Sequence, residues 1–200
     1  MKIKLESEQI SLSKYETEYL FMVSRGNNKI DIYHNEKHHI ESMPAGSEVY
    51  DLQLCKNILR VLCKTENVTY VIFEKNMDTG EIVRQIPLNI KRKLKYASFV
   101  NDSLLILVKE NQATLFNWTN HQNLIVLDID SLVVLSNIGY NRMEKRLQCI
   151  ASNSNNEIQL VSACVEGIKE QHISKFLGFD FSVYSEVYIT SRYIYTKSEN

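Results

Sequence analysis

The histidines are the residues whose spacing comes closest to that of a metal site. His34, His38 and His39 are three of the five histidines in the chain, and imidazole nitrogens are common zinc ligands. His34 and His38 would share one face of a helix, but the surrounding pattern predicts a strand, a turn and a second strand. Glu36 and Glu41 are the only nearby side chains that could add oxygen ligands. We therefore interpret the cluster as solvated turn residues and predict no metal site.

Two carboxylates at strand spacing occur at Asp128 and Asp130, where both could face the same side of a strand. General acid–base catalysis or calcium binding would need further partners. Because the sequence places none near them, a polar loop between strands is the better interpretation. No nucleophile lies in a recognisable turn motif, and the six glycines are too scattered to form a phosphate-binding loop. The sequence therefore predicts a protein that is not an enzyme and uses no cofactor.

The strongest concentration of charge is the run Lys91-Arg92-Lys93-Leu94-Lys95. Its four cations could bind phosphates or an acidic segment of a partner, and a solvated loop without a partner is the alternative. Base stacking would require exposed aromatic side chains, but we expect the neighbouring Tyr96 and Phe99 to point into a strand core. The basic run is the first predicted partner-binding site, for protein or for nucleic acid.

Tyrosines concentrate towards the C-terminus, at Tyr184, Tyr188, Tyr193 and Tyr195. Tyrosine is favoured in strands and also at the energetic centres of protein interfaces. Strand propensity alone accounts for the pattern, and an aromatic patch that binds a partner is the alternative. Tyr188, Tyr193 and Tyr195 are therefore the second predicted partner-binding site.

Composition restricts the compartment and the partners. The formal net charge of −1 gives the chain no general attraction for nucleic acid or anionic membranes. No apolar stretch approaches the ~20 residues that would span a bilayer, and the first residues lack the apolar run of a signal peptide. Buried reduced thiols explain the cysteines better than disulfides or a metal site, because Cys55, Cys63, Cys149 and Cys164 include no CxxC pair. We expect a protein of the cytoplasm or nucleus without a membrane partner.

A repeated pair of apolar strands underlies these residues. With Leu20, Leu59, Leu104 and Leu147 as anchors, the repeat recurs after 39, 45 and 43 residues. Several short strands in each unit of about forty residues predict an all-β fold, and specifically a β-propeller. The repeats predict strands at 8–13, 19–24, 29–33 and 39–43; at 49–54, 58–64, 68–74 and 81–86; at 94–100, 103–108, 113–118 and 123–128; and at 132–137, 146–151, 157–162 and 168–173.

The two ends of the chain decide how many blades there are. Strands predicted at 179–183, 186–190 and 193–196 lack a fourth partner, which Lys2–Leu5 could supply. On that count residues 1–200 form a single propeller domain of about five small blades. The alternative is a partial propeller that is completed by a partner, or the N-terminal part of a longer protein. Short helical turns are expected only at 11–19 and 166–177.

Residues Thr69–Leu88 resemble part of a WD repeat, in which a strand ends in Trp-Asp and a turn with Thr-Gly-Glu opens the outer strand. Phe73-Glu74 stands at the Trp-Asp position, and Thr79-Gly80-Glu81 forms the turn. The corresponding positions of the other repeats hold different residues, and no Gly-His pair precedes any repeat. The resemblance implies a divergent WD-repeat-like propeller, and covers about twenty residues as a motif.

A propeller period without a catalytic motif favours a non-catalytic protein–protein interaction scaffold, a subunit of an intracellular multiprotein complex. This inference is partly an analogy, because a fold does not fix a function. An accessory module that binds RNA or ribonucleoprotein through residues 91–95 is the alternative. A propeller enzyme or lectin with a site in a central channel is the third hypothesis.

Overall fold

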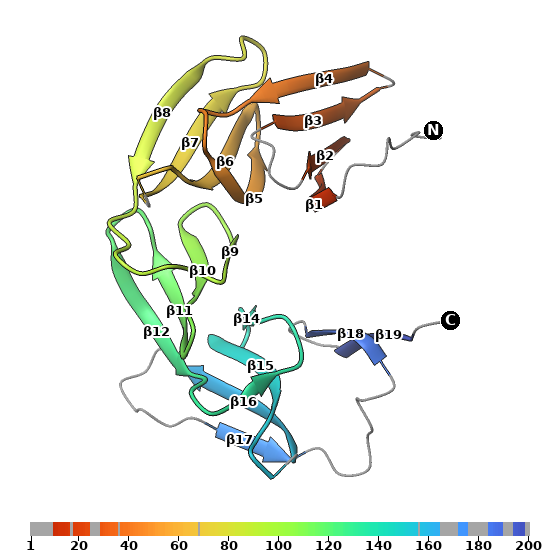
Figure 1. The fold of residues 1–200 in the computed structure, drawn as a ribbon, viewed down its shortest axis with the longest axis vertical. Helices are drawn as coiled ribbons and strands as arrows, with labels where there is room; N and C mark the ends of the chain where they lie inside the picture. The colour runs from red at the N-terminus through yellow and green to blue at the C-terminus, as the bar shows by residue number, and fades with distance from the viewer. Residues whose placement is uncertain are drawn as a thin grey trace. The chain divides into compact units, whose positions relative to one another are not determined.

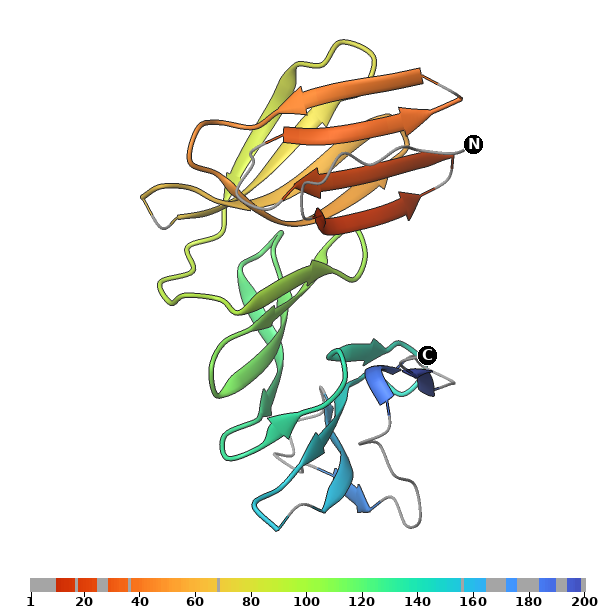
Figure 2. The same ribbon diagram turned by 45° about the vertical axis from the view of Figure 1, so that its right-hand side comes forward.

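The strands of the described residues pair in antiparallel sheets. The computed structural model describes residues 10–16, 18–24, 29–35, 37–67, 69–155, 157–164, 172–175, 184–189 and 194–198. Within each four-stranded sheet, strands that follow one another in sequence also pair with one another, as Figures 1 and 2 show for β5–β8. None of the described segments is a helix that is long and apolar enough to cross a bilayer.

Three sheets have four strands each, and each sheet corresponds to one sequence repeat. The first contains β1 (Ile10–Glu16), β2 (Tyr19–Ser24), β3 (Lys29–His34) and β4 (Lys37–Ser42). The second contains β5 (Glu48–Cys55), β6 (Ile58–Lys64), β7 (Tyr70–Asn76) and β8 (Ile82–Pro87). The third contains β9 (Tyr96–Phe99), β10 (Leu104–Val108), β11 (Gln112–Asn117) and β12 (Gln122–Asp128).

The fourth repeat departs from this plan at its inner edge. Two short strands, β13 (Val133–Val134) and β14 (Gly139–Asn141), pair with different parts of the same neighbour, β15 (Arg146–Ser152). The sheet continues through β16 (Ile158–Cys164) and β17 (His172–Lys175). A separate pair of strands, β18 (Tyr184–Ile189) and β19 (Ile194–Ser198), follows it.

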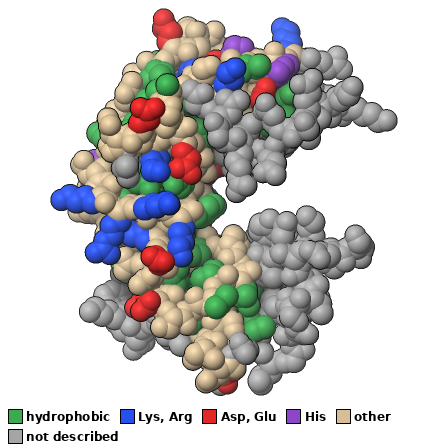
Figure 3. All heavy atoms as spheres, viewed as in Figure 1, with side chains coloured by type: hydrophobic (Ala, Val, Ile, Leu, Met, Phe, Trp, Pro, Cys, Tyr) green, Lys and Arg blue, Asp and Glu red, His purple; other side chains and the backbone are tan. Residues whose placement is uncertain are grey.

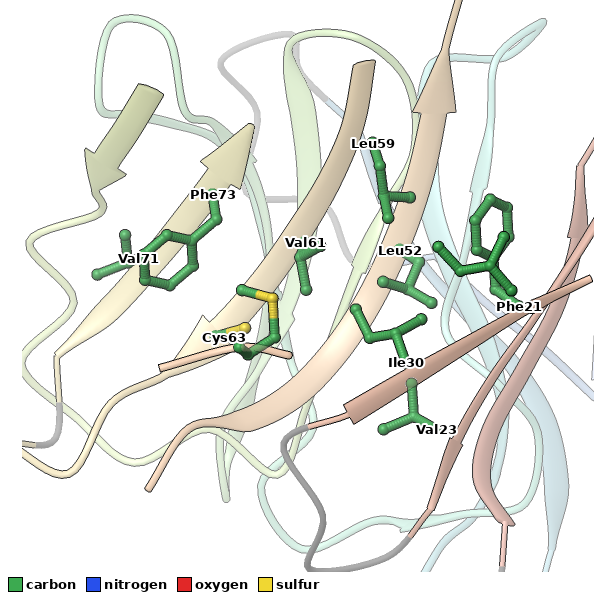
Figure 4. Close-up of a cluster of buried hydrophobic side chains, with 11 residues drawn as sticks. Phe21, Val23, Ile30, Leu52, Leu59, Val61, Cys63, Val71 and Phe73 are labelled. Carbon is green, nitrogen blue, oxygen red and sulfur yellow. The ribbon is translucent and has the colours of Figure 1, made fainter. Parts of the chain in front are cut away.

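The chain divides into two compact units, Met1–Lys93 with Ala97–Asp102, and Leu94–Tyr96 with Ser103–Asn200. In the first unit, the apolar side chains of the first two sheets form one buried cluster. Figure 4 shows Phe21 and Ile30 on one sheet facing Leu52 and Leu59 on the other. These side chains are fully buried, as expected for near-continuous apolar strands that are covered on both faces.

A buried carboxylate adds polar links within the first unit. Asp51 accepts hydrogen bonds from Lys14 Nζ at 3.1 Å, from the amide of Leu52 at 2.8 Å and from the amide of Phe99 at 2.7 Å. Burial raises the pKa of Asp51, although Lys14 and the two amides act in the opposite direction. Asp51 on β5 therefore holds both β1 and β9.

Apolar residues of β10, β11, β12 and β15 are buried in the second unit, among them Leu105, Leu115, Leu127 and Leu147. The sheet that contains β18 contributes Ile189, which packs against the fully buried Ile150. The backbone of Ile189 lies close to Gly139: its carbonyl oxygen is 3.1 Å from the position that a Cβ atom on Gly139 would occupy.

Within the described residues, the predicted strands agree with the observed ones within a few residues, except the one predicted at 132–137, which is interrupted; β2 and β6 match their predicted bounds. The helical turn predicted at 11–19 is wrong, because residues 10–16 form β1. The helical turn predicted at 166–177 is wrong where it is described, since His172–Lys175 is a strand. The strands predicted at Lys2–Leu5 and 179–183 lie outside the described residues.

Candidate functional site

The basic run forms the connection from β8 to β9, as its position between two repeats predicted. Lys91, Arg92, Lys93 and Lys95 are all exposed, and Figure 3 shows Lys and Arg side chains gathered where β8 is followed by β9. The segment is fixed at both ends. Leu88 and Leu94 are buried, and the amides of Leu88 and Lys95 donate to the carbonyls of Tyr70 and Val108 at 2.9 and 2.8 Å.

The charges of this segment are largely uncompensated. Within the described part of the chain, no ion pair involves Lys91, Arg92 or Lys93, and Lys95 lies 4.0 Å from Glu110 with both side chains mostly exposed. Arg60, by contrast, forms ion pairs with Glu74 and Asp102 at 2.9 and 2.8 Å. The basic segment is thus anchored through its backbone and buried leucines, while its cationic groups face solvent.

The expectation for Tyr96 is wrong. Its side chain is 43% exposed rather than turned into a strand core, because Tyr96 is the first residue of β9 and the next residue, Ala97, points to the buried face. Phe99 is half-buried. An aromatic ring therefore stands directly beside the basic segment.

Tyr96 also lines a pocket of about 460 Å³ in the second unit, a volume typical of ligand pockets. We refer to it as the Tyr96 pocket. Its remaining wall is mainly aliphatic, and its rim carries two lysines and a glutamate; the lining residues are Lys95, Tyr96, Val108, Lys109, Glu110, Ile129, Leu132, Val134, Ser136, Asn137 and Ile138.

The pocket lies where the inner strand of the fourth sheet is interrupted. The sequence predicts one strand at 132–137, but β13 ends at Val134 and β14 begins at Gly139. In the gap, the amides of Leu135 and Ser136 both donate to the carbonyl of Ile150, at 2.8 and 3.3 Å. Sequence analysis missed this feature, and the polar Ser136-Asn137 pair within an apolar run is the signal that could have indicated it.

The polar side chains in this gap already form hydrogen bonds within the protein. Ser136 Oγ accepts a hydrogen bond from the amide of Ile150 at 2.9 Å and lies 2.7 Å from the carbonyl oxygen of Asn137. Asn137 Oδ1 accepts the amide of Ile189 at 2.7 Å, and its Nδ2 donates to the carbonyl of Ile189 at 3.4 Å. These groups are held in place, and Lys95 and Lys109 are the cationic side chains among the lining residues.

A second hollow, of about 370 Å³, lies in the first unit beside β3 and β4. It includes His34 and His39 of the predicted histidine cluster. The predicted order of strand, turn and strand is confirmed, but the histidines lie on the strands β3 and β4 rather than in the turn. Each histidine faces a carboxylate: His34 is 3.5 Å from Glu18, His38 is 2.7 Å from Asp31 and His39 is 2.5 Å from Glu41. Among the described residues, no group of three or more metal-ligating side chains is brought together.

Glu41 is the centre of the charges at this hollow. It forms an ion pair with Lys75, which is itself buried, and a hydrogen bond with His39. Burial of Glu41 favours its neutral form, but the contacts with Lys75 and His39 outweigh burial, and the pKa of Glu41 is lowered. Because its charges compensate one another internally, this hollow is a weaker candidate for ligand binding than the Tyr96 pocket.

The other described residues that the sequence analysis selected lie in a turn or on paired strands. Asp128 Oδ1 accepts the amide of Asp130 at 2.9 Å in the turn after β12, consistent with a polar loop. Tyr188 and Tyr195 lie directly opposite one another on β18 and β19, whereas Tyr193 lies outside the described residues. The structure therefore brings the backbones of Tyr188 and Tyr195 together on neighbouring strands.

The comparisons with known proteins identify the fold. No family model and no curated protein matches the chain. A chain in a crystal structure of a mitotic checkpoint complex matches with a TM-score of 0.57 and 14% identity, over 94% of this chain and 60% of that chain. Kluyveromyces lactis Hsv2 matches with a TM-score of 0.55 and 12% identity, over 96% of this chain and 58% of that protein.

These similarities and the antiparallel four-stranded sheets show an all-β fold of the β-propeller class. The chain spans 60% and 58% of the length of these two chains. The WD-repeat resemblance of Thr69–Leu88 stays a prediction, although two of its features have clear structural roles. Phe73 is buried, and Gly80 adopts a φ of 70° in the hairpin turn, a conformation that glycine tolerates best.

Proposed function

We propose that this protein is a non-catalytic scaffold that binds other proteins, a subunit of a multiprotein complex in the cytoplasm or nucleus. Residues 1–200 would act as one propeller domain, and neither an enzymatic step nor a cofactor is part of the proposal. The observation that supports it is the mainly aliphatic Tyr96 pocket of the second unit, which is lined by Lys95 of the basic segment and by Lys109. Interfaces commonly combine an apolar centre with a charged rim.

The decisive experiment isolates the tagged chain from its native source and measures its companions by mass spectrometry. The test variant carries Lys91→Glu, Arg92→Glu and Lys93→Glu. The control carries Lys29→Glu, Lys56→Glu and Arg84→Glu, which are also exposed cations and change the net charge equally. We expect a stoichiometric protein companion that is retained by the control and lost by the test variant. A chain that purifies without companions would contradict the proposal.

Binding of RNA is the second candidate function. It is supported by the four exposed cations at 91–95 together with the exposed ring of Tyr96, because single-stranded nucleic acid is bound by cations and stacking aromatics. Four phosphate contacts would make affinity for poly(U) fall about 50-fold between 50 and 200 mM salt. Affinity that is absent, or that does not depend on salt, would exclude this function.

A further inference from the structure

We propose that the Tyr96 pocket binds a short acidic segment of a partner protein through large apolar side chains of that segment. This inference rests on the proposed scaffold function and specifies both the surface and the chemistry of the partner. It assigns the apolar side chains to the interior of the pocket and the carboxylates to the lysines at its rim.

The apolar character of the proposed ligand follows from the wall of the pocket. Val108, Ile129 and Ile138 are almost fully buried and line the pocket together with the half-buried Leu132 and Val134. Each apolar group that a ligand buries against them gains free energy in proportion to the area removed from water. The polar atoms of Ser136 and Asn137 are already hydrogen-bonded within the chain, so they do not require a polar ligand.

The sign of the partner's charge follows from the rim. Lys95 and Lys109 line it, and Glu110 is the acidic residue among the lining side chains. The separation of 4.0 Å between Lys95 Nζ and Glu110 Oε1, with side chains 63% and 84% exposed, makes this pair weak. Lys93 precedes Lys95 by two residues and extends the positive charge along the chain. A carboxylate-bearing segment would complement this rim and associate faster.

A peptide fits this pocket better than a nucleic acid does. Stacking of bases requires several aromatic platforms, whereas Tyr96 is the single aromatic residue among the lining side chains. The other apolar residues of the wall are aliphatic and fit leucine, isoleucine, phenylalanine or tryptophan anchors. Among these, tryptophan is enriched at the energetic centres of protein interfaces.

The inference can be tested with a phage-displayed library of random short peptides, selected on the purified chain. We expect the enriched peptides to combine Asp or Glu with large apolar residues. Synthetic copies of the enriched peptides, followed by fluorescence anisotropy, should bind the variant Leu132→Asp at least about tenfold more weakly. The control Val83→Asp changes an exposed valine of β8 and should leave affinity unchanged.

A second variant keeps the test valid if Leu132→Asp does not fold. Lys95→Glu combined with Lys109→Glu alters rim residues, and we expect it to weaken acidic peptides at least about tenfold while strengthening peptides whose acidic residues are replaced by lysine. Three results would overturn the proposal. They are a selection without enriched peptides, enriched peptides that lack acidic residues, and peptides that bind both variants as tightly as they bind the wild type. Displacement of the peptides by poly(U) would assign the surface to nucleic acid instead. If the protein companion is lost when Lys91, Arg92 and Lys93 are changed, but peptide affinity does not change in the pocket variants, this inference fails and the scaffold function stands.

Discussion

At the scale of single residues, burial divides the four cysteines into two classes. Cys63 and Cys149 are buried, and burial raises the pKa of each thiol to about 12. Cys55 and Cys164 are partly exposed. Because the thiolate is the reactive form, we predict that iodoacetamide at pH 8 modifies Cys55 and Cys164 in the folded protein but spares Cys63 and Cys149.

Mass spectrometry of the digested protein measures this difference at each cysteine. The same reaction in urea provides the control, because all four thiols should then be modified. Modification of Cys63 or Cys149 at the rate of Cys55 in native buffer would show that the core around them is open.

The buried ion pair of Glu41 with Lys75 gives a pH-dependent prediction. Because the pKa of Glu41 is lowered in the folded state, its contribution to stability is present above the unfolded value of 4.5 and is lost as pH falls through the folded value. Glu41→Gln leaves Lys75 without its ionic partner and should lower the free energy of unfolding by about 2 kcal/mol at pH 7. The difference between wild type and variant should shrink below pH 4.5.

Urea unfolding at pH 7 and at acidic pH measures both values. The matched control is Glu81→Gln, which changes an exposed glutamate and should alter stability little at either pH. A loss for Glu41→Gln that stays constant as the pH falls would argue against the ion pair as its cause.

At the scale of structural elements, Asn137 connects the interrupted inner strand of the fourth sheet to β18. Its side chain makes two hydrogen bonds with the backbone of Ile189. Asn137→Ala removes both and leaves backbone groups of Ile189 without these partners, so we expect a loss of about 1–3 kcal/mol. Urea unfolding followed by Trp118 fluorescence measures it. Asn123→Ala, at an exposed position of β12, should have little effect, and an equal loss in both variants would refute the role of Asn137.

The order and bounds of the strands could be predicted because each repeat has a long apolar strand with a clear turn after it. The segment Ile58–Lys64 is an example: its residues are mostly buried, and its apolar pattern alone marks its ends. The gap between Val134 and Gly139 could not be predicted, because it depends on contacts with Ile150 and Ile189, distant in sequence. Local patterns carry no information about such contacts.

The conformation of turn residues was also only partly predictable from the sequence. Asn35 and Asn89 adopt positive φ, which asparagine tolerates better than most residues. Asn153 instead uses its side chain, since its Oδ1 accepts the amides of Asn155 and Glu157 at 2.9 and 3.0 Å. Asparagine stabilises turns by either mechanism, and the sequence does not distinguish them. The basic segment was predictable because its charge is local, whereas the apolar pocket beside it is formed by residues from several strands.

At the scale of the whole molecule, the residues of β9 are divided between the two compact units. Its first residue, Tyr96, belongs to the second unit and Ala97–Phe99 to the first. The amide of Lys95, just before the strand, donates to Val108, and the amide of Phe99 at its other end donates to the buried Asp51. Because residues of this one strand belong to both units, we predict that the units unfold in a single transition.

Two natural probes can test this cooperativity in one protein. Trp118, the single tryptophan, is buried in the second unit, and Cys63 is buried in the first. A variant with Cys55→Ser, Cys149→Ala and Cys164→Ser retains Cys63 as its only thiol. We predict that the urea midpoint from Trp118 fluorescence coincides with the midpoint from labelling of Cys63, because coincident probes are the mark of all-or-none unfolding. Both curves should give one slope of about 1–3 kcal/mol per molar urea. Separate midpoints would instead show that the two units unfold as independent domains.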